Sequence, residues 1–147
     1  MSKQKTYYAK KKNIKEKWYS IDATGKTLGR LSSLISFILR GKSRVDFTPS
    51  MPMQDFVIVY NTDKLVVTGN KAKDKMYYRY SGYPGGITGV SFEHQMKKDS
   101  RKVIYSALKG MLPHNRLGRQ LITKVKLYHG ETHPHQAQDP KNITFKL

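Results

Sequence analysis

Cysteine is absent from this chain, and that absence excludes several kinds of function. Without a thiol there is no disulfide, no cysteine nucleophile and no zinc site built on thiolates. The absence of disulfides is typical of a cytosolic protein and unlike a small secreted scaffold. The 147 residues correspond to about one domain, which is long enough to bury a core without covalent staples.

Long apolar runs are absent as well. No run approaches the roughly 20 residues that a transmembrane helix needs. The basic residues 1–18 are followed by no apolar core of the kind that a signal peptide has. We therefore expect a soluble, cytoplasmic protein without a membrane partner.

Acidic residues are scarce, with 10 Asp and Glu against 28 Lys and Arg and a net charge of +18. A solvated protein surface normally mixes the two signs of charge. Such an excess predicts an anionic partner, and nucleic acid is the usual one because each neutralised phosphate releases condensed counterions. An anionic membrane surface is the alternative, which the lack of a basic amphipathic helix disfavours.

Patterns typical of enzymes are missing. The acidic residues are scattered singly, so no paired carboxylates serve acid–base chemistry, and no G-x-S-x-G turn surrounds a serine. Gly25-Lys26-Thr27 would end a P-loop only if a glycine stood at Ser20. The His-Pro-His sequence at 133–135 suits a structural or RNA-facing role better than metal ligation. We expect no catalysis, no cofactor and no metal.

Hydrophobic patterning predicts alternating strands and helices. Strands are expected at 18–23, 56–60, 65–68 and 125–128, and helices at 27–40, 91–98, 100–111 and 115–123. Residues 70–89 are glycine-rich and aromatic and are expected to be irregular or edge structure. The alternation favours an α/β layer fold with helices on both faces of a small sheet. Residues 1–17 are expected to form a flexible basic arm, and residues 18–147 a single domain.

Basic residues gather in two places. Residues 100–130 contain no acid, whereas a merely solvated helix carries glutamates as i,i+4 partners of its cations. In the loop 113–119, two arginines stand at a predicted helix start, where phosphate binding is favourable. Residues 71–86 interleave tyrosines with cations, a mixture that favours unpaired RNA bases over duplex DNA. No motif that enters a major groove is present.

These features give a set of candidate RNA-binding residues, most of them cations. They are Lys26, Arg30, Arg40, Lys42, Lys71, Lys75, Tyr78, Arg79, Lys109, His114, Asn115, Arg116, Arg119 and Lys124. Gly25 and Gly29 are expected to be structural, Gly25 in a tight turn and Gly29 at a close approach of the helix to a neighbour.

Several blocks resemble one known family. They include WYSIDATGKTLGRLSS at 18–33, DFVIVYNTDKLVVTGN at 55–70, KGMLPHNRLGR at 109–119 and HPHQAQDP at 133–140. In this order they resemble the universal family of large-subunit ribosomal protein thirteen, in its bacterial form. The chain departs from the usual family pattern at residues 50–54 and at Tyr80.

The resemblance implies a three-layer α/β/α fold with a small, mostly parallel four-stranded sheet and extended loops. The turn at 61–64 would instead join antiparallel strands, so the direction of strand 65–68 stays open. The resemblance further implies a non-catalytic constituent of the large ribosomal subunit that binds ribosomal RNA early in assembly. Its partners would be that RNA and neighbouring ribosomal proteins, with no homo-oligomer. A nucleotide-dependent enzyme and a free regulatory RNA-binding protein are the alternatives.

Overall fold

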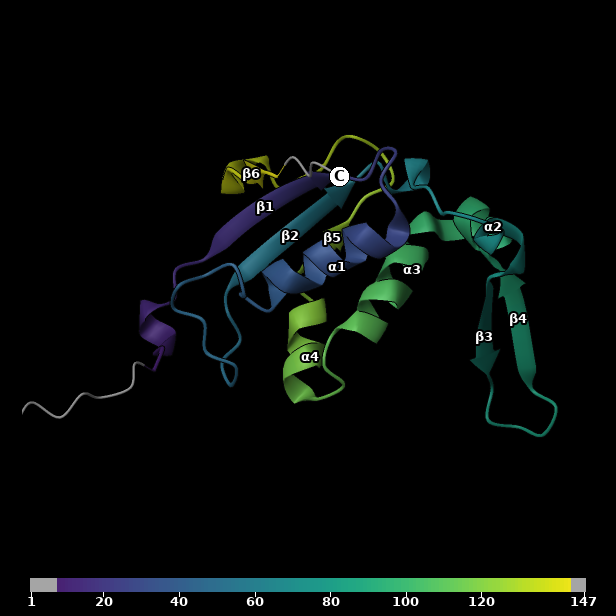
Figure 1. Ribbon diagram of the computed structural model, residues 1–147, viewed down its shortest axis with the longest axis horizontal. Helices are drawn as coiled ribbons and strands as arrows, with labels where there is room; N and C mark the ends of the chain where they lie inside the picture. The colour runs from purple at the N-terminus through teal and green to yellow at the C-terminus, as the bar shows by residue number, and fades with distance from the viewer. Residues whose placement is uncertain (1–7, 144–147) are drawn as a thin grey trace, which may run out of the picture.

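A four-stranded parallel sheet forms the centre of the fold. The computed structural model describes residues 8–143 (Figure 1). Its strands are β1 (Lys17–Asp22), β2 (Asp55–Tyr60), β5 (Val125–Leu127) and β6 (Lys141–Asn142), in the order β5-β2-β1-β6. β1 and β2 pair along their whole length, from Lys17 opposite Asp55 to Asp22 opposite Tyr60. The predicted α/β fold with a small parallel sheet is therefore confirmed.

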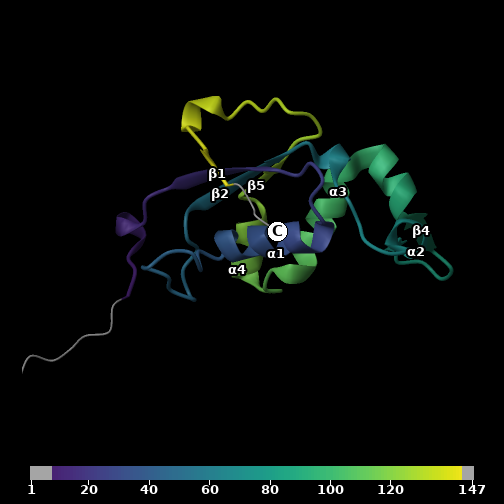
Figure 2. The same ribbon diagram turned by 45° about the horizontal axis from the view of Figure 1, so that its top comes forward.

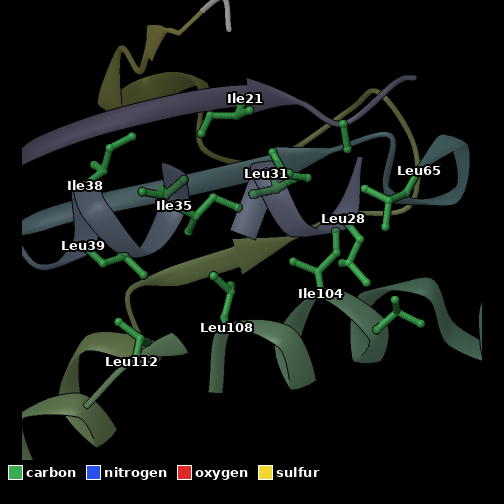
Figure 3. Packing of buried hydrophobic residues seen from close by; sticks show 14 of the residues in the cluster. Ile21, Leu28, Leu31, Ile35, Ile38, Leu39, Leu65, Ile104, Leu108 and Leu112 are labelled. Atoms are coloured by element: carbon green, nitrogen blue, oxygen red, sulfur yellow. The ribbon is translucent and has the colours of Figure 1, made fainter. Parts of the chain in front are cut away.

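Helices cover one face of the sheet and form the main core with it. Helix α1 (Leu28–Leu39) lies along β1 and β2, and α3 (Phe92–Met111) and α4 (Arg116–Ile122) pack below it (Figure 1). Leucine and isoleucine recur every three to four residues in α1, which gives the helix one apolar face. Ile35 of α1 lies between Ile21 of β1 and Leu108 of α3, and all three side chains are buried (Figure 3).

The segment that joins β5 to β6 covers the other face (Figure 2). It contains the short 3-10 helix η3 (Gln136–Gln138). Trp18 and Phe56 project from neighbouring strands and stack with their ring centroids 4.4 Å apart. His135 lies 5.3 Å from the Trp18 ring, and its Nε2 is 2.8 Å from the hydroxyl of Tyr128. Aromatic side chains therefore pack on this face of the sheet, whereas aliphatic side chains pack on the face that the helices cover.

The fourth strand is not the one that the sequence predicted. Residues 65–68 form only an isolated parallel bridge between Val66 and Thr27, beside the 3-10 helix η2 (Thr62–Lys64). Leu65 is buried in the core, whereas Val66 is 46% exposed. The fourth strand of the sheet is instead β6, which pairs with Tyr19 and Ser20 of β1. The prediction of a strand at 65–68 is therefore wrong, because this stretch supplies Leu65 and the partly buried Val67 to the core and holds the turn before α1 through the backbone of Val66.

Residues 70–91 are more regular than expected. They form α2 (Lys71–Asp74) and an antiparallel hairpin of β3 (Met76–Tyr80) and β4 (Ile87–Ser91). The hairpin extends away from the body of the protein, beyond α3 (Figure 1). Most of its side chains are exposed, so neither face shows the alternation of apolar and polar residues that marks a half-buried strand. The prediction of irregular or edge structure for residues 70–89 did not foresee this ordered pair of strands, because exposed strands leave no such alternation in the sequence.

The remaining predicted elements are close to those observed. Asp99 has extended backbone angles, φ −164° and ψ 97°, and divides α3 into the two predicted helices. The 3-10 helix η1 (Lys11–Asn13) precedes β1. Residues 8–17 are not a free arm, since Ala9 and Ile14 are buried against Met53. Residues 1–7 of the expected arm lie outside the described part of the chain.

A buried ion pair ties this N-terminal segment to the sheet. Arg44 Nη1 lies 2.8 Å from Asp55 Oδ1, with the two side chains 6% and 0% exposed. The same Nη1 donates to the carbonyl of Lys15 at 3.0 Å, and Arg44 Nε lies 3.1 Å from Asp46. Arg44 therefore holds together the segment before β1, the loop after α1 and the first residue of β2.

Candidate functional site

A groove between α3 and α4 brings together several of the predicted RNA-binding residues. Its volume is about 380 Å³, and its lining residues are Tyr105, Lys109, Leu112, Pro113, His114, Gly118, Arg119 and Ile122. Lys109, His114 and Arg119 are exposed there, as is Arg116 at the start of α4. Among residues 8–143, no acidic side chain forms an ion pair with Lys109, Arg116 or Arg119. Their charges are therefore available to an anion.

Hydrogen bonds fix the loop between α3 and α4. Asn115 Oδ1 accepts from the backbone N–H of Gly118 at 2.8 Å and caps α4. His114 Nε2 lies 3.2 Å from the carbonyl oxygen of Lys109, so that nitrogen is the donor. Asn115 was predicted to bind RNA, and the structure gives its carbonyl oxygen the structural role of a cap.

Gly118 keeps this loop close to α4, and its replacement by alanine is expected to destabilise the protein by about 3 kcal/mol. A Cβ at position 118 would lie 1.7 Å from the carbonyl oxygen of Pro113. Backbone cannot rotate away as a side chain does, so the loop must move. Gly110→Ala is the matched control, because a Cβ there meets nothing within 4 Å. Urea denaturation of both variants tests this, and equal stabilities would contradict it.

A second cavity lies between the start of α1, α2 and α3. Its volume is about 270 Å³, and Lys71 and Lys75 line it together with Thr27 and Gly29. Lys26 and Arg30 flank these α1 residues in sequence, and Arg30 is exposed. The structure thus places four predicted cations around the N-terminal end of α1.

The turn before α1 cannot cradle a phosphate as a P-loop does. The backbone N–H of Gly25 donates to the carbonyl oxygen of Lys64, and the backbone N–H of Lys26 donates to the carbonyl oxygen of Ala23. The Thr24 N–H donates to Asp22 Oδ1 at 2.9 Å. These donors are already used within the protein. Gly25 has φ +66°, as the predicted turn requires, but a Cβ at Gly29 would meet nothing within 4 Å, so the expected close helix contact at Gly29 is wrong.

The hairpin divides its tyrosines between two roles. Tyr77 is half-buried and packs against the core cluster, and burial raises the pKa of its hydroxyl. Tyr78 is 72% exposed, and Arg79 beside it is exposed too. Of the two neighbouring tyrosines, only Tyr78 has its ring available for a partner.

Three further predicted residues lie after α1 and before β5. Arg40 shares a small cavity with Asn115, and Lys42 is exposed. Lys124 is half-buried, and its Nζ donates to the carbonyl oxygen of Met53 and lies 5.6 Å from the centroid of the Phe56 ring. Burial lowers the pKa of Lys124. The structure therefore gives Lys124 an internal packing role in place of the predicted surface role.

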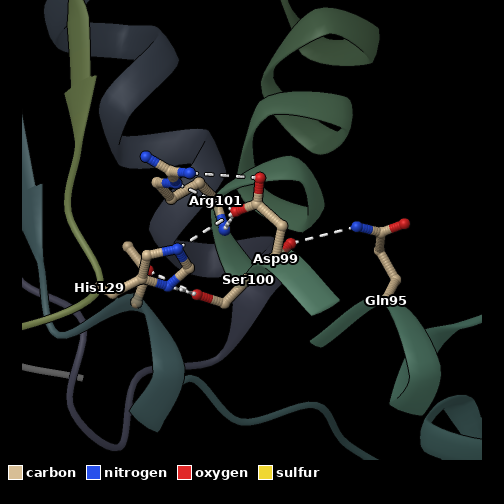
Figure 4. A network of polar contacts seen from close by, with 6 residues as sticks. Gln95, Asp99, Ser100, Arg101 and His129 are labelled. Carbon is tan, nitrogen blue, oxygen red and sulfur yellow. Dashed lines mark hydrogen bonds and ion pairs between the residues drawn. The ribbon is translucent and has the colours of Figure 1, made fainter. Parts of the chain in front are cut away.

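Asp99, Ser100 and His129 form a contact set that resembles a nucleophilic triad (Figure 4). His129 Nε2 lies 3.3 Å from Asp99 Oδ1, and His129 Nδ1 lies 2.9 Å from Ser100 Oγ. Ser100 is buried, however, and its Oγ is also 2.7 Å from Thr62 Oγ1. A substrate cannot reach this hydroxyl. The set instead joins the break in α3 to η2 and to the end of β5.

Residues that bind metals are not grouped in the described part of the chain. Residues 8–143 contain no cluster of three or more His, Cys, Asp or Glu side chains able to hold an ion. His133 lies near the rings of Tyr60 and Tyr128, on the sheet face where aromatic side chains pack. Nor does any helix there combine the length and the apolar character needed to cross a bilayer.

Comparison with known proteins gives the family. The family model described as Ribosomal protein L13 matches residues 16–134. The chain belongs to the ribosomal protein L13 family. It is 53% identical over 139 residues to the large ribosomal subunit protein uL13 of Symbiobacterium thermophilum, covering 95% of this chain and 97% of that protein. It is 51% identical over 142 residues to uL13 of a Thermoanaerobacter species, covering 97% and 99%.

Membership of the L13 family confirms the resemblance stated from the sequence and agrees with a non-catalytic role.

Tyr105 of the α3–α4 groove was missed by the sequence analysis. Tyr105 precedes Lys109 by one helical turn and lines the same groove. Its position within the acid-free run 100–130 was the available signal, because i and i+4 residues share a helix face.

Proposed function

We propose that this chain is a structural constituent of the large ribosomal subunit that binds large-subunit ribosomal RNA and neighbouring ribosomal proteins. Its relatives are named as proteins of that subunit. The observation that carries the RNA-binding role is the set of exposed cations around the α3–α4 groove, which have no acidic partner within residues 8–143. Joining the particle early in assembly is part of the same proposal.

The proposed interface is the helix side of the sheet together with the hairpin. Helices α1, α3 and α4 lie on that side, and the hairpin extends from it (Figures 1 and 2). The cations of α1, α2 and the α3–α4 groove would neutralise phosphates, and Tyr78 would stack on an unpaired base. Lys124 and the carbonyl oxygen of Asn115 would act indirectly, by holding the surface in shape. Residues 1–17 would be a basic N-terminal segment of the chain, held to the single domain of residues 18–147 through Ala9 and Ile14.

Binding to large-subunit ribosomal RNA is expected to weaken steeply with salt. Each phosphate contact contributes about 0.7–0.9 to the slope of log K against log salt concentration. A dozen candidate cations and polar groups share the surface, so we expect a slope of magnitude about 5 or more. Filter binding of transcribed RNA between low and moderate potassium chloride measures it. A flat response would remove charge neutralisation as the mechanism.

A further inference from the structure

We propose that the α3–α4 groove holds one unpaired base of the RNA, stacked on Tyr105, with the flanking phosphates on Lys109 and Arg119. The inference rests on the RNA-binding function proposed above and names the ligand of one part of that surface. It adds to charge neutralisation a stacking contact with one base.

Tyr105 is the first observation. Its side chain is 46% exposed, although it stands in a helix whose neighbouring residues Ile104 and Leu108 are fully buried. It is not part of the hydrophobic core cluster. Within residues 8–143 its hydroxyl has no hydrogen bond and its ring no aromatic partner. A large aromatic ring that is half exposed and has no aromatic or hydrogen-bonding partner among these residues is available for a ligand, and aromatic side chains are common platforms for unpaired bases.

The shape of the groove is the second observation. Its volume of about 380 Å³ falls in the range of small-molecule sites, about 300–1,000 Å³. Leu112, Pro113 and Ile122 supply apolar lining between the two helices. A base has a flat apolar face and a polar edge. It can therefore cover this lining and the Tyr105 ring while its backbone stays at the rim.

The charges around the groove complement a nucleotide. Lys109 follows Tyr105 by four residues, so the two side chains share one face of α3. Arg119 lines the groove from α4, and a guanidinium can bind a phosphate through two hydrogen bonds. No acidic residue lines the groove, and none occurs from 100 to 130, so its lining carries no carboxylate that would repel the phosphates.

His114 gives the groove a polar contact for the edge of a base. Its Nε2 donates to the carbonyl oxygen of Lys109 at 3.2 Å, since a carbonyl can only accept. In the neutral ring Nδ1 is then an acceptor, with no partner among residues 8–143. This acceptor can take a hydrogen bond from an exocyclic amino group of adenine, cytosine or guanine, or from the ring N–H of guanine or uracil.

Tyr105→Ala tests the stacking contact without changing the charge. We expect its affinity for transcribed large-subunit ribosomal RNA to fall about tenfold, the effect of losing one base–aromatic stack, with an unchanged salt slope. Tyr105→Phe keeps the ring and should bind as the parent protein does. Met111→Ala is the matched control, because Met111 is similarly exposed on α3, at 43%, and lines the other cavity. Circular dichroism checks that all variants fold.

Chemical probing of the RNA locates the base. With dimethyl sulfate, kethoxal and a carbodiimide, which together report on all four bases, we expect one unpaired nucleotide that the parent, Tyr105→Phe and Met111→Ala proteins protect and that becomes reactive with Tyr105→Ala. If Tyr105→Ala gives the parent affinity and the parent protections, the groove holds no base, while salt-dependent binding by the parent leaves the proposed function standing. If the parent protein itself does not bind the RNA, both proposals fail.

Discussion

Arg44→Met is expected to destabilise the protein by about 3–5 kcal/mol, because it leaves the Asp55 carboxylate buried without its counter-ion. Asp55 is 0% exposed, and its second oxygen Oδ2 has no hydrogen bond among the described residues. Methionine keeps the apolar stem of the arginine but neither its charge nor its donors. Urea denaturation at neutral pH measures the loss.

The pH dependence identifies the cause of this loss. Burial already raises the pKa of Asp55, although Arg44, Lys17 and Lys124 oppose the shift, and removal of Arg44 should raise it further. A carboxyl whose pKa is higher in the folded state binds its proton more tightly there, so the stability of the variant should rise as pH falls toward that folded pKa. If the difference in the free energy of unfolding between the parent protein and Arg44→Met does not shrink in acid, an unpaired Asp55 carboxylate is not the cause of the loss.

The double variant Arg44→Met with Asp55→Leu is the control for Arg44→Met. It removes both charges, and replacement of a whole buried pair by apolar residues is often close to neutral. We therefore expect it to recover most of the lost stability. If the double variant is as unstable as the single one, the loss comes from packing around Arg44 and not from the charge on Asp55.

Replacing Lys109, Arg116 and Arg119 with glutamine is expected to weaken binding to ribosomal RNA by about a hundredfold or more near 0.1 M salt. Three lost phosphate contacts lower the magnitude of the salt slope by about 2–3, and at that salt concentration each unit of slope corresponds to about tenfold in affinity. All three residues are exposed, so the fold should be unchanged. Filter binding at several salt concentrations gives both quantities.

A charge-matched control separates this site from net charge. Lys12, Lys15 and Lys141 are exposed and lie before β1 and in β6, outside the proposed interface. Their replacement by glutamine removes the same charge, and we expect a clearly smaller loss of affinity and a smaller change of slope. Equal losses in the two triple variants would mean that the α3–α4 surface has no special part in binding.

The parts of the fold that the sequence predicted are those whose side chains pack into the main core. β1, α1 and β2 show their periodicity because each buries one or both faces. The hairpin was missed because Tyr78, Tyr80 and Ile87 are exposed, so its order comes from backbone pairing, which leaves little pattern. β6 was missed because Lys141 and Asn142 are polar and show no apolar pattern. They also pair with β1, which lies near the other end of the sequence.

The sequence could indicate the candidate site as a region but not the role of each residue in it. A run without acids located the surface around residues 100–130, since charge sign can be read from sequence alone. Whether a single lysine side chain is exposed or buried cannot be read from the sequence in this way. Lys124 donates a hydrogen bond to the carbonyl oxygen of Met53, a residue far from it in the chain. Tyr105 lines a groove only because α4 folds back beside α3.

Sedimentation of a cell lysate on a sucrose gradient at low magnesium, which separates the ribosomal subunits, tests the central claim most directly. Each fraction is probed for this chain. The structural role predicts that the chain migrates with the large subunit, at about one copy per particle, and remains there after a moderate salt wash, because many phosphate contacts hold it. A chain found only at the top of the gradient would contradict a role as a constituent of the subunit.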